Sequence, residues 1–152
     1  MQLNTTTLVT LNNLALANND RMAAYHQAIE LMKGKEKTGT DCTDLLEFFT
    51  NYHNDSRAFS NQLALLAGHN FYQPGADEQP VNMFTGLGTS FEADRSKVLA
   101  LCYQGEEQTG KIYEYALNED DIPAGTKNIL MRQKDEVVRA QKILESLLQR
   151  AA

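Results

Sequence analysis

The sequence predicts an all-α four-helix bundle, and three observations indicate it. Apolar residues recur in alternating steps of three and four along four long segments, the spacing that keeps one helix face turned to a core. Two short polar connections join these segments in pairs, and one long connection separates the pairs. No segment of the sequence competes as a strand. A chain of 152 residues suits one domain with a substantial core, so we assign residues 1–152 to a single domain.

The first predicted helix covers residues 5–33 and carries the clearest apolar stripe. Its inward positions are Leu8, Leu11, Ala15, Asn18, Met22, Tyr25, Ile29 and Met32. Threonines at Thr5–Thr7 offer N-caps at its start. Gly34, between two lysines, fits the position just past the end of a helix, where basic residues also favour the dipole.

The other three helices are predicted at residues 42–67, 93–117 and 123–150. Asp41 is a good N-cap for the second helix, and Gly68 ends it. The fourth begins with a proline, which the first helical position tolerates because its N–H would have no intrahelical partner.

The long connection at residues 69–91 predicts the topology. If the second and third helices point the same way, the chain must return along the bundle between them. A helix of about 25 residues is roughly 38 Å long, and an extended chain covers about 3.3 Å per residue, so this connection can span it. We therefore predict an up-down-down-up bundle in which residues 69–91 form the crossover.

Composition excludes several classes of function. The net charge of −6 argues against general nucleic-acid binding, which needs a basic surface, and against binding to anionic membranes. The N-terminus lacks the basic and apolar regions of a signal peptide, and no apolar stretch reaches the roughly 20 residues of a membrane span. Two cysteines are too few for a disulfide framework, so we expect a cytoplasmic protein.

Polar residues interrupt the predicted inward stripes in their middle turns. They are Asn18, Asp55, Ser56, Glu106, Gln133 and Gln141. A bundle that binds two metals in its core needs inward glutamates and a Glu-x-x-His motif on two helices. No Glu-x-x-His occurs in this sequence. The pattern therefore predicts the fold but assigns no chemistry.

The third predicted helix resembles that of a known family. Residues 95–107, RSKVLALCYQGEE, followed by Tyr113 and Ala116-Leu117, are similar to a Cys-Glu-x-Gly-Glu-Asp run followed by Tyr and Ala-Leu. That run is typical of small bacterial proteins described as ferritin-like four-helix-bundle domains of unknown function. Rubrerythrin and ferritin are more distant relatives in shape. The resemblance implies a ferritin-like bundle and no defined enzyme activity.

The resemblance extends over the other helices, with two departures. Similar segments are Leu11-Asn12-Asn13-Leu14, Asp20 and Tyr25 in the first helix, Ser56-Arg57, Phe59 and Leu63 in the second, and Pro123 and Arg132-Gln133 in the fourth. Tyr103 stands where the family usually has Glu, and Gln141 where its fourth helix is expected to have His. Both departures remove types of metal ligand.

Three carboxylates are the candidate metal ligands. Asp55, Glu106 and Glu136 lie on or near the inward stripes, and three carboxylates in one layer would suit a hard cation, with iron or manganese as the alternative cofactor. In the competing interpretation each pairs with an arginine: Arg21, Arg57, Arg132 or Arg139. We predict this pairing, and assign no catalytic residue, metal ligand or cofactor.

Histidines and cysteines give little sign of a site. His26, His53 and His69 lack zinc-ligand spacing, so we interpret them as boundary residues. Cys42 lies at the first turn of the second helix, where the dipole can lower the pKa of a thiol, so a reactive cysteine is an alternative there. Cys102 lies on an apolar stripe and is predicted to be a small core residue.

Three tyrosines recur on the inward stripes. Tyr25, Tyr52 and Tyr113 come from three helices and are expected to meet in the bundle. Paired with Asp55 or Glu106, they would form a buried hydrogen-bond network that satisfies their hydroxyls.

We expect a non-enzymatic protein that acts through self-association, with a dimer favoured, or through a protein partner. The missing ligand set and the apolar residues of the 69–91 crossover motivate this expectation, since those residues could seal an interface. The alternative is a metal-binding ferritin-like protein with an incomplete di-metal carboxylate site, used for oxidase chemistry or iron handling.

Overall fold

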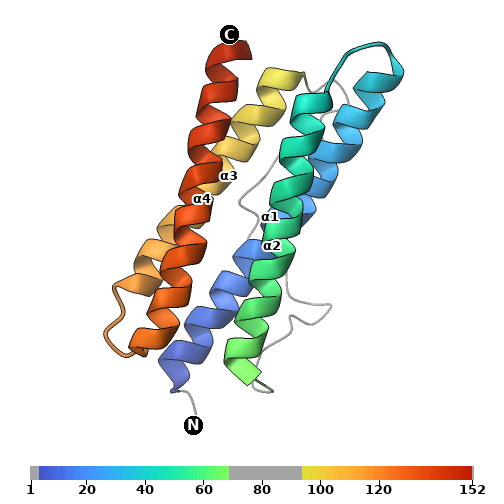
Figure 1. The fold of residues 1–152 in the computed structure, drawn as a ribbon. Helices are drawn as coiled ribbons and strands as arrows, with labels where there is room; N and C mark the ends of the chain where they lie inside the picture. Colours follow the sequence, from blue (N-terminus) through green and yellow to red (C-terminus); the bar gives the residue numbers. More distant parts are fainter. Residues whose placement is uncertain (1–3, 69–93, 152) are drawn as a thin grey trace.

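The structure is a computed structural model that describes residues 4–68 and 94–151, and these residues form four α-helices (Figure 1). The helices are α1 (Thr5–Lys37), α2 (Thr43–Ala67), α3 (Arg95–Leu117) and α4 (Ala124–Ala151). The described ranges contain no strand. The prediction of four helices and no strand is therefore confirmed for the described residues. The predicted crossover at residues 69–91 lies outside the described residues.

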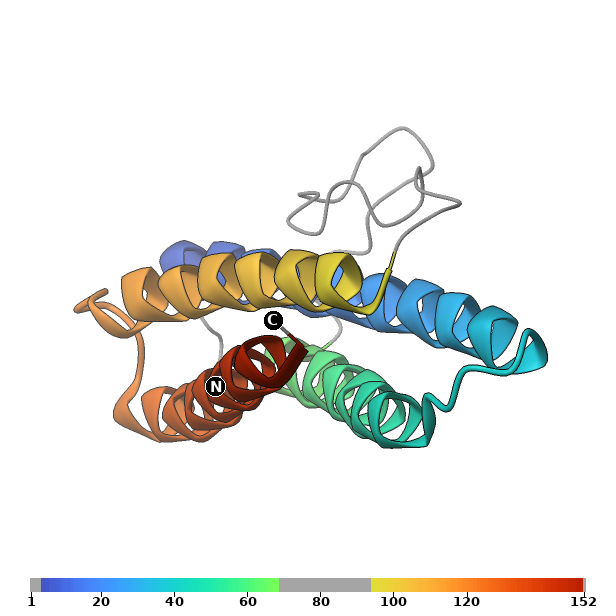
Figure 2. The same cartoon turned by 90° about the horizontal axis from the view of Figure 1, so that it is seen from above.

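The helices form two antiparallel hairpins. In Figure 1, α1 and α2 run in opposite directions, and so do α3 and α4. Contacts are most extensive within these hairpins, smaller between α1 and α3, and smaller still between α2 and α4. Seen from above, α1 and α3 lie on one side of the bundle and α2 and α4 on the other (Figure 2). The hairpins therefore meet mainly through α1 and α3.

Two contacts at opposite ends fix how the hairpins lie relative to each other. The Asn4 side-chain amide donates to the carbonyl oxygen of Asp121 at 2.8 Å, so the start of α1 lies beside the α3–α4 turn. At the other end, the Arg95 guanidinium binds both carboxylate oxygens of Asp44, with Nη1 and Oδ1 at 3.2 Å. Because Asp44 and Arg95 begin α2 and α3, these two helices run in the same direction.

Side-chain caps explain two of the helix starts. The Asn4 carboxamide oxygen accepts from the backbone N–H of Thr7 at 2.7 Å, so Asn4 caps α1 instead of the threonines that follow it. Asp94 caps α3 in the same way and accepts from the N–H of Lys97 at 2.8 Å. Each cap satisfies an N–H that the helix itself leaves without a partner.

The end of α1 differs from the prediction. The helix continues through Gly34, an exposed interior glycine that costs about 1 kcal/mol relative to alanine. It ends where Gly39 takes a positive φ of 97°, a backbone conformation that glycine adopts without strain. The N–H of Gly39 donates to Glu36 and that of Thr40 to Lys35. These two bonds form a Schellman motif, which satisfies the last carbonyls and sets the true stop.

The other predicted bounds agree with the structure to within two residues, as is usual for helix ends. The fourth helix begins one residue after Pro123, whose carbonyl accepts from the N–H of Lys127 at 2.9 Å.

The core contains two apolar clusters. The aromatic cluster is built around Tyr25, Phe48, Phe49 and Tyr52, with Met32, Leu45, Val98, Leu99, Cys102 and Leu144 among its other members. The aliphatic cluster contains Leu11, Leu14, Ala15, Leu63, Ala67, Tyr113, Ala116, Leu130 and Val137. Along α1, α2 and α3, the buried residues between the two clusters that are larger than alanine are polar. The middle of the bundle is therefore where a site has to be sought first.

Candidate functional site

Buried polar side chains from three helices form a connected network in the middle of the bundle. We call it the central polar network, and its members are Asn18, Arg21, Glu106, Tyr113 and Gln133. Periodicity places Asn18 and Arg21 on the inner face of α1, Glu106 and Tyr113 on that of α3, and Gln133 on that of α4. Buried polar groups are costly unless they are hydrogen-bonded, so their partners decide what the network is.

An ion pair between Arg21 and Glu106 forms the deepest part of the network. The Arg21 Nε donates to Oε1 of Glu106 at 2.7 Å, and Nη2 donates to Oε2 at 2.9 Å. Both side chains are fully buried. Two parallel bonds between a guanidinium and a carboxylate are the strongest common form of charge-assisted hydrogen bond. The Arg21 guanidinium also lies over the ring of Phe59, 5.7 Å from its centroid.

Each partner changes the pKa of the other. Burial alone lowers the pKa of Arg21, but the charge and hydrogen bonds of Glu106 outweigh it and raise the pKa above its ordinary value. The pKa of Glu106 is raised above its ordinary value because of burial, although the charge and hydrogen bonds of Arg21 and a hydrogen bond with Tyr25 offset part of that rise. Arg21 therefore keeps its charge in the interior, and its bidentate contact stabilises the ionised form of Glu106.

The network continues from the ion pair to the surface of α2. Asn18 accepts from Nη1 of Arg21 at 2.8 Å and donates to the hydroxyl oxygen of Tyr113 at 2.8 Å. That hydroxyl donates to Oε1 of Gln133 at 2.6 Å, and Nε2 of Gln133 donates to the exposed Gln62 on α2 at 2.9 Å. With Gln62, all four helices are linked through one chain of hydrogen bonds.

The network has the chemistry of a structural element. Burial raises the pKa of Tyr113, so its hydroxyl stays protonated near neutral pH. Two further buried hydroxyls, on Ser56 and Thr109, donate to carbonyls of their own helices, Tyr52 at 2.7 Å and Gly105 at 2.9 Å. These contacts hold the two hydroxyls in place.

The three candidate metal ligands do not come together. Glu106 is held by Arg21, one of the four arginines expected as partners, and Glu136 pairs with Arg139 at 3.3 Å. Asp55 is half-buried, and its pKa is raised first by burial and next by the negative charge of Glu136 on α4. Within residues 4–68 and 94–151, no three His, Cys, Asp or Glu side chains could hold one metal ion.

Two of the three histidines meet across the α1–α2 hairpin. The ring centroids of His26 and His53 are 6.2 Å apart, with the first side chain exposed and the second half-buried. Their positions at the edge of the helix contact agree with the prediction of boundary residues. Their proximity could not be predicted from zinc-ligand spacing along the chain, because the two histidines lie on different helices. His69 lies outside the described residues.

Both cysteines are buried in the aromatic cluster. Cys42 is the N-cap residue of α2, yet burial raises the pKa of its thiol. The alternative of a reactive Cys42 stays a prediction, and the burial of the thiol acts against its ionisation. Cys102 is a buried core residue as predicted, and burial raises its thiol pKa as well.

The three inward tyrosines take two different positions. The rings of Tyr25 and Tyr52 lie together in the aromatic cluster, with centroids 6.1 Å apart. Tyr113 instead belongs to the central polar network, between Asn18 and Gln133. The predicted pairing of a tyrosine with Glu106 is also present, because the Tyr25 side chain makes a hydrogen bond to Glu106, and this bond connects Tyr25 to the network that contains Tyr113.

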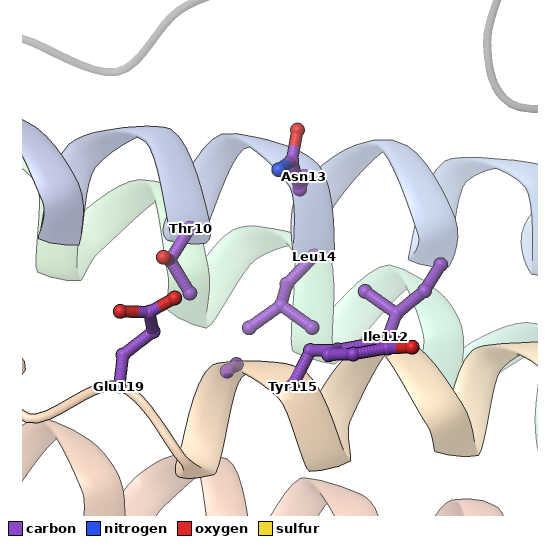
Figure 3. A pocket seen from close by; sticks show the side chains of 7 residues that line it. Thr10, Asn13, Leu14, Ile112, Tyr115 and Glu119 are labelled. Carbon is purple, nitrogen blue, oxygen red and sulfur yellow. The ribbon is translucent and has the colours of Figure 1, made fainter.

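An open pocket of about 400 Å³ lies between α1 and α3 on the outside of the bundle (Figure 3). Its lining residues are Thr10, Asn13, Leu14, Ile112, Tyr115, Ala116 and Glu119. In Figure 3, Thr10 and Glu119 face each other at one end, Tyr115 and Ile112 lie at the other, and Leu14 lies between them. The Tyr115 side chain is 76% exposed, which is unusual for a ring of this size. Apolar periodicity does not predict this pocket, because Tyr115 lies off the inward stripe of α3.

Arg21 lies at the centre of the polar network, although the sequence predicted it only as one of four arginines that could pair with a carboxylate. Its position along the chain does indicate the inward orientation, because Arg21 follows the inward Asn18 by three residues and so lies on the same helix face.

No protein-family model, curated protein or solved structure matches this chain. In the part of the chain that the structure describes, no helix combines the length and apolar character needed to cross a membrane.

Proposed function

We propose that this protein is a ferritin-like bundle of up-down-down-up topology that acts without catalysis, as a homodimer formed through the pocket between α1 and α3. The observation that carries the proposal is Tyr115, a 76% exposed aromatic side chain on the rim of an open, partly apolar pocket. Tyrosine is enriched in protein interfaces, where it supplies a large contact area and a polar tip.

The surface around Tyr115 suits contact with a second copy. A two-fold interface brings the same patch of both subunits together, so the patch must be complementary to itself. Exposed Lys111 lies beside Tyr115, and the acidic Glu119 lies at the far end of the pocket. With both signs of charge flanking one aromatic residue, Lys111 of one copy can approach Glu119 of the other while the tyrosines enter the pockets.

The ferritin-like assignment is supported by the helix directions and by the centre of the bundle. α1 and α4 run one way and α2 and α3 the other, which is the order that a crossover between α2 and α3 produces (Figure 1). Ferritin-like bundles place metal-binding glutamates in the middle of their core. Here Glu106 takes such a place, and the Arg21 guanidinium satisfies it as a cation would.

Sedimentation velocity at micromolar concentration tests the dimer. We expect Tyr115→Ala to raise the dissociation constant about 30-fold or more, since interface tyrosines that matter contribute about 2 kcal/mol or more. Leu65→Ala is the matched control, because Leu65 is 83% exposed on α2 and does not line the pocket. A protein that is monomeric at these concentrations, or a dimer that only Leu65→Ala weakens, contradicts the proposal.

The electrostatics of Asp55 keep metal binding as a second candidate. Its pKa is raised first by burial and then by the negative charge of Glu136, and a cation bound at Asp55 would offset that repulsion. Elemental analysis after growth with added iron and manganese distinguishes the two candidate functions. About one equivalent of metal, lost in Asp55→Ala, would establish the second candidate. Metal far below one equivalent, unchanged in Asp55→Ala, would remove it.

A further inference from the structure

The α1–α2 hairpin has a fixed register along one edge of its contact. The Ser60 hydroxyl on α2 donates to the side-chain oxygen of Asn19 on α1 at 3.0 Å. His26 is seven residues after Asn19, and His53 is seven residues before Ser60. Seven residues make about two helical turns, so in an antiparallel hairpin the two pairs lie on the same edge, two turns apart. The meeting of His26 and His53 is therefore set by the register of the helices.

Packing beneath the histidines holds their backbones in place. Tyr25 and Tyr52 each precede one of the histidines and pack together in the aromatic cluster, with ring centroids 6.1 Å apart. In an antiparallel pair of helices, the residues one step beyond such a facing pair turn toward the same side of the contact. His26 and His53 therefore reach the same surface from a rigid base.

The distance between the rings is close to what a shared ion requires. An imidazole nitrogen binds zinc at about 2.0–2.1 Å, which places two rings on one ion with centroids about 5 Å apart. The present separation is 6.2 Å, and the exposed His26 can rotate to close the difference. Both rings border solvent, so water can supply the remaining ligands.

We infer that His26 and His53 form a surface site for a divalent transition-metal ion that prefers nitrogen ligands. Zn²⁺, Ni²⁺ and Cu²⁺ belong to this class, whereas Ca²⁺ and Mg²⁺ require oxygen ligands. No third His, Cys, Asp or Glu joins the pair within the described residues, so the ion keeps open positions and exchanges more readily than in a four-ligand structural site. Bound there, it would join α1 to α2. The site lies on a different helix contact from the proposed dimer pocket and does not depend on it.

Calorimetric titration of the metal-free full-length protein with ZnCl₂ and NiCl₂ tests the site, with CaCl₂ and MgCl₂ as negative controls. We expect one equivalent of zinc or nickel per chain and a zinc-dependent rise in Tm, because an ion that binds only the folded state stabilises it. His26→Gln and His53→Gln should each lower the affinity at least tenfold and abolish the rise in Tm. His69→Gln, which removes a histidine elsewhere in the chain, is the matched control and should leave both unchanged.

Several results would overturn the inference. They are no heat of binding with either ion, equal loss of affinity in all three variants, and unchanged affinity in His26→Gln or His53→Gln. Half an equivalent of zinc together with zinc-induced association in sedimentation would also overturn it, because the ion would then join two chains. Circular dichroism checks that each variant keeps its helices, and Gln at these edge positions leaves the core intact.

Discussion

The two apolar clusters and the central polar network hold the same four helices together by different forces. The clusters act through the removal of apolar surface from water, which is non-directional and contributes about 1.5–3 kcal/mol for each large side chain that is fully buried. The network acts through bonds of fixed direction, and the burial of its two charges offsets much of what their attraction provides. Stability therefore comes chiefly from the ends of the core, and the network specifies how the hairpins fit together.

The largest expected effect comes from breaking the ion pair on one side only. Arg21→Ala leaves Glu106 buried with an uncompensated charge and also removes the packing on Phe59. We expect a loss of about 3–5 kcal/mol in the free energy of unfolding, toward the upper end of that range. Urea denaturation measured against the wild type gives this value.

The double variant Arg21→Met with Glu106→Leu shows whether the network itself contributes net stability. Replacing a buried ion pair by apolar residues of similar size is often neutral or stabilising by about 1–4 kcal/mol. We expect a protein at least as stable as the wild type. A double variant as unstable as Arg21→Ala would show that the ion pair contributes net stability, and the contrast between network and clusters would then fail.

Phe49→Ala tests the aromatic cluster. Phe49 is fully buried and contacts the rings of Tyr25 and Phe48, so its removal leaves a large cavity. We expect a loss of about 3–5 kcal/mol in the free energy of unfolding, again by urea denaturation. Leu65→Ala, at an exposed position on α2, is the control and should change it by less than about 0.5 kcal/mol.

Tyr113→Phe removes a single hydroxyl from the network and keeps the ring. Gln133 then loses the donor to its Oε1, and Asn18 loses one acceptor while keeping its bond to the carbonyl of Leu14. Leaving a buried polar group without its partner costs about 1–3 kcal/mol. A change near zero would mean that the remaining groups find new partners, and hydrogen exchange of the α1 and α4 amides would show whether the helices loosen.

The smallest effect is expected at the surface, where Arg95 binds Asp44. Both side chains are partly exposed, so Arg95→Ala should lower the free energy of unfolding by no more than about 1 kcal/mol at neutral pH. The hydrogen bond from Arg95 lowers the pKa of Asp44, so this contribution is present above the ordinary carboxyl value of 3.8 and is lost as pH falls through the lower folded value. Denaturation at pH 6 and pH 3 should show a smaller difference between the two proteins at pH 3.

Much of the fold could be predicted from periodicity and caps, because they are local. The spacing of apolar residues placed Leu11, Tyr25 and Val98 in the core, and all are buried. The end of α1 could not be predicted as well, since Gly34 and Gly39 are both compatible with a stop. The choice between them depends on backbone bonds that only Gly39 and Thr40 complete.

The candidate site could be predicted only in part. Periodicity indicated that Asn18, Glu106 and Gln133 point inward, which they do. It could not indicate which arginine reaches Glu106, because a long side chain at the edge of a stripe can turn to solvent or to the core, and the neighbouring helix decides. The contact between His26 and His53 likewise depends on the register of two helices that no spacing along the chain reveals.

The buried salt link between Arg21 and Glu106 also limits the paths along which this protein can evolve. Replacing only one of the two side chains leaves an unpaired charge in the interior, so each single substitution produces a poorly folding variant. An apolar pair at the same two positions could fold as well, yet it is two simultaneous changes away. The pair can therefore be retained in evolution because both single substitutions are unfavourable, even if the ion pair adds no net stability over an apolar pair.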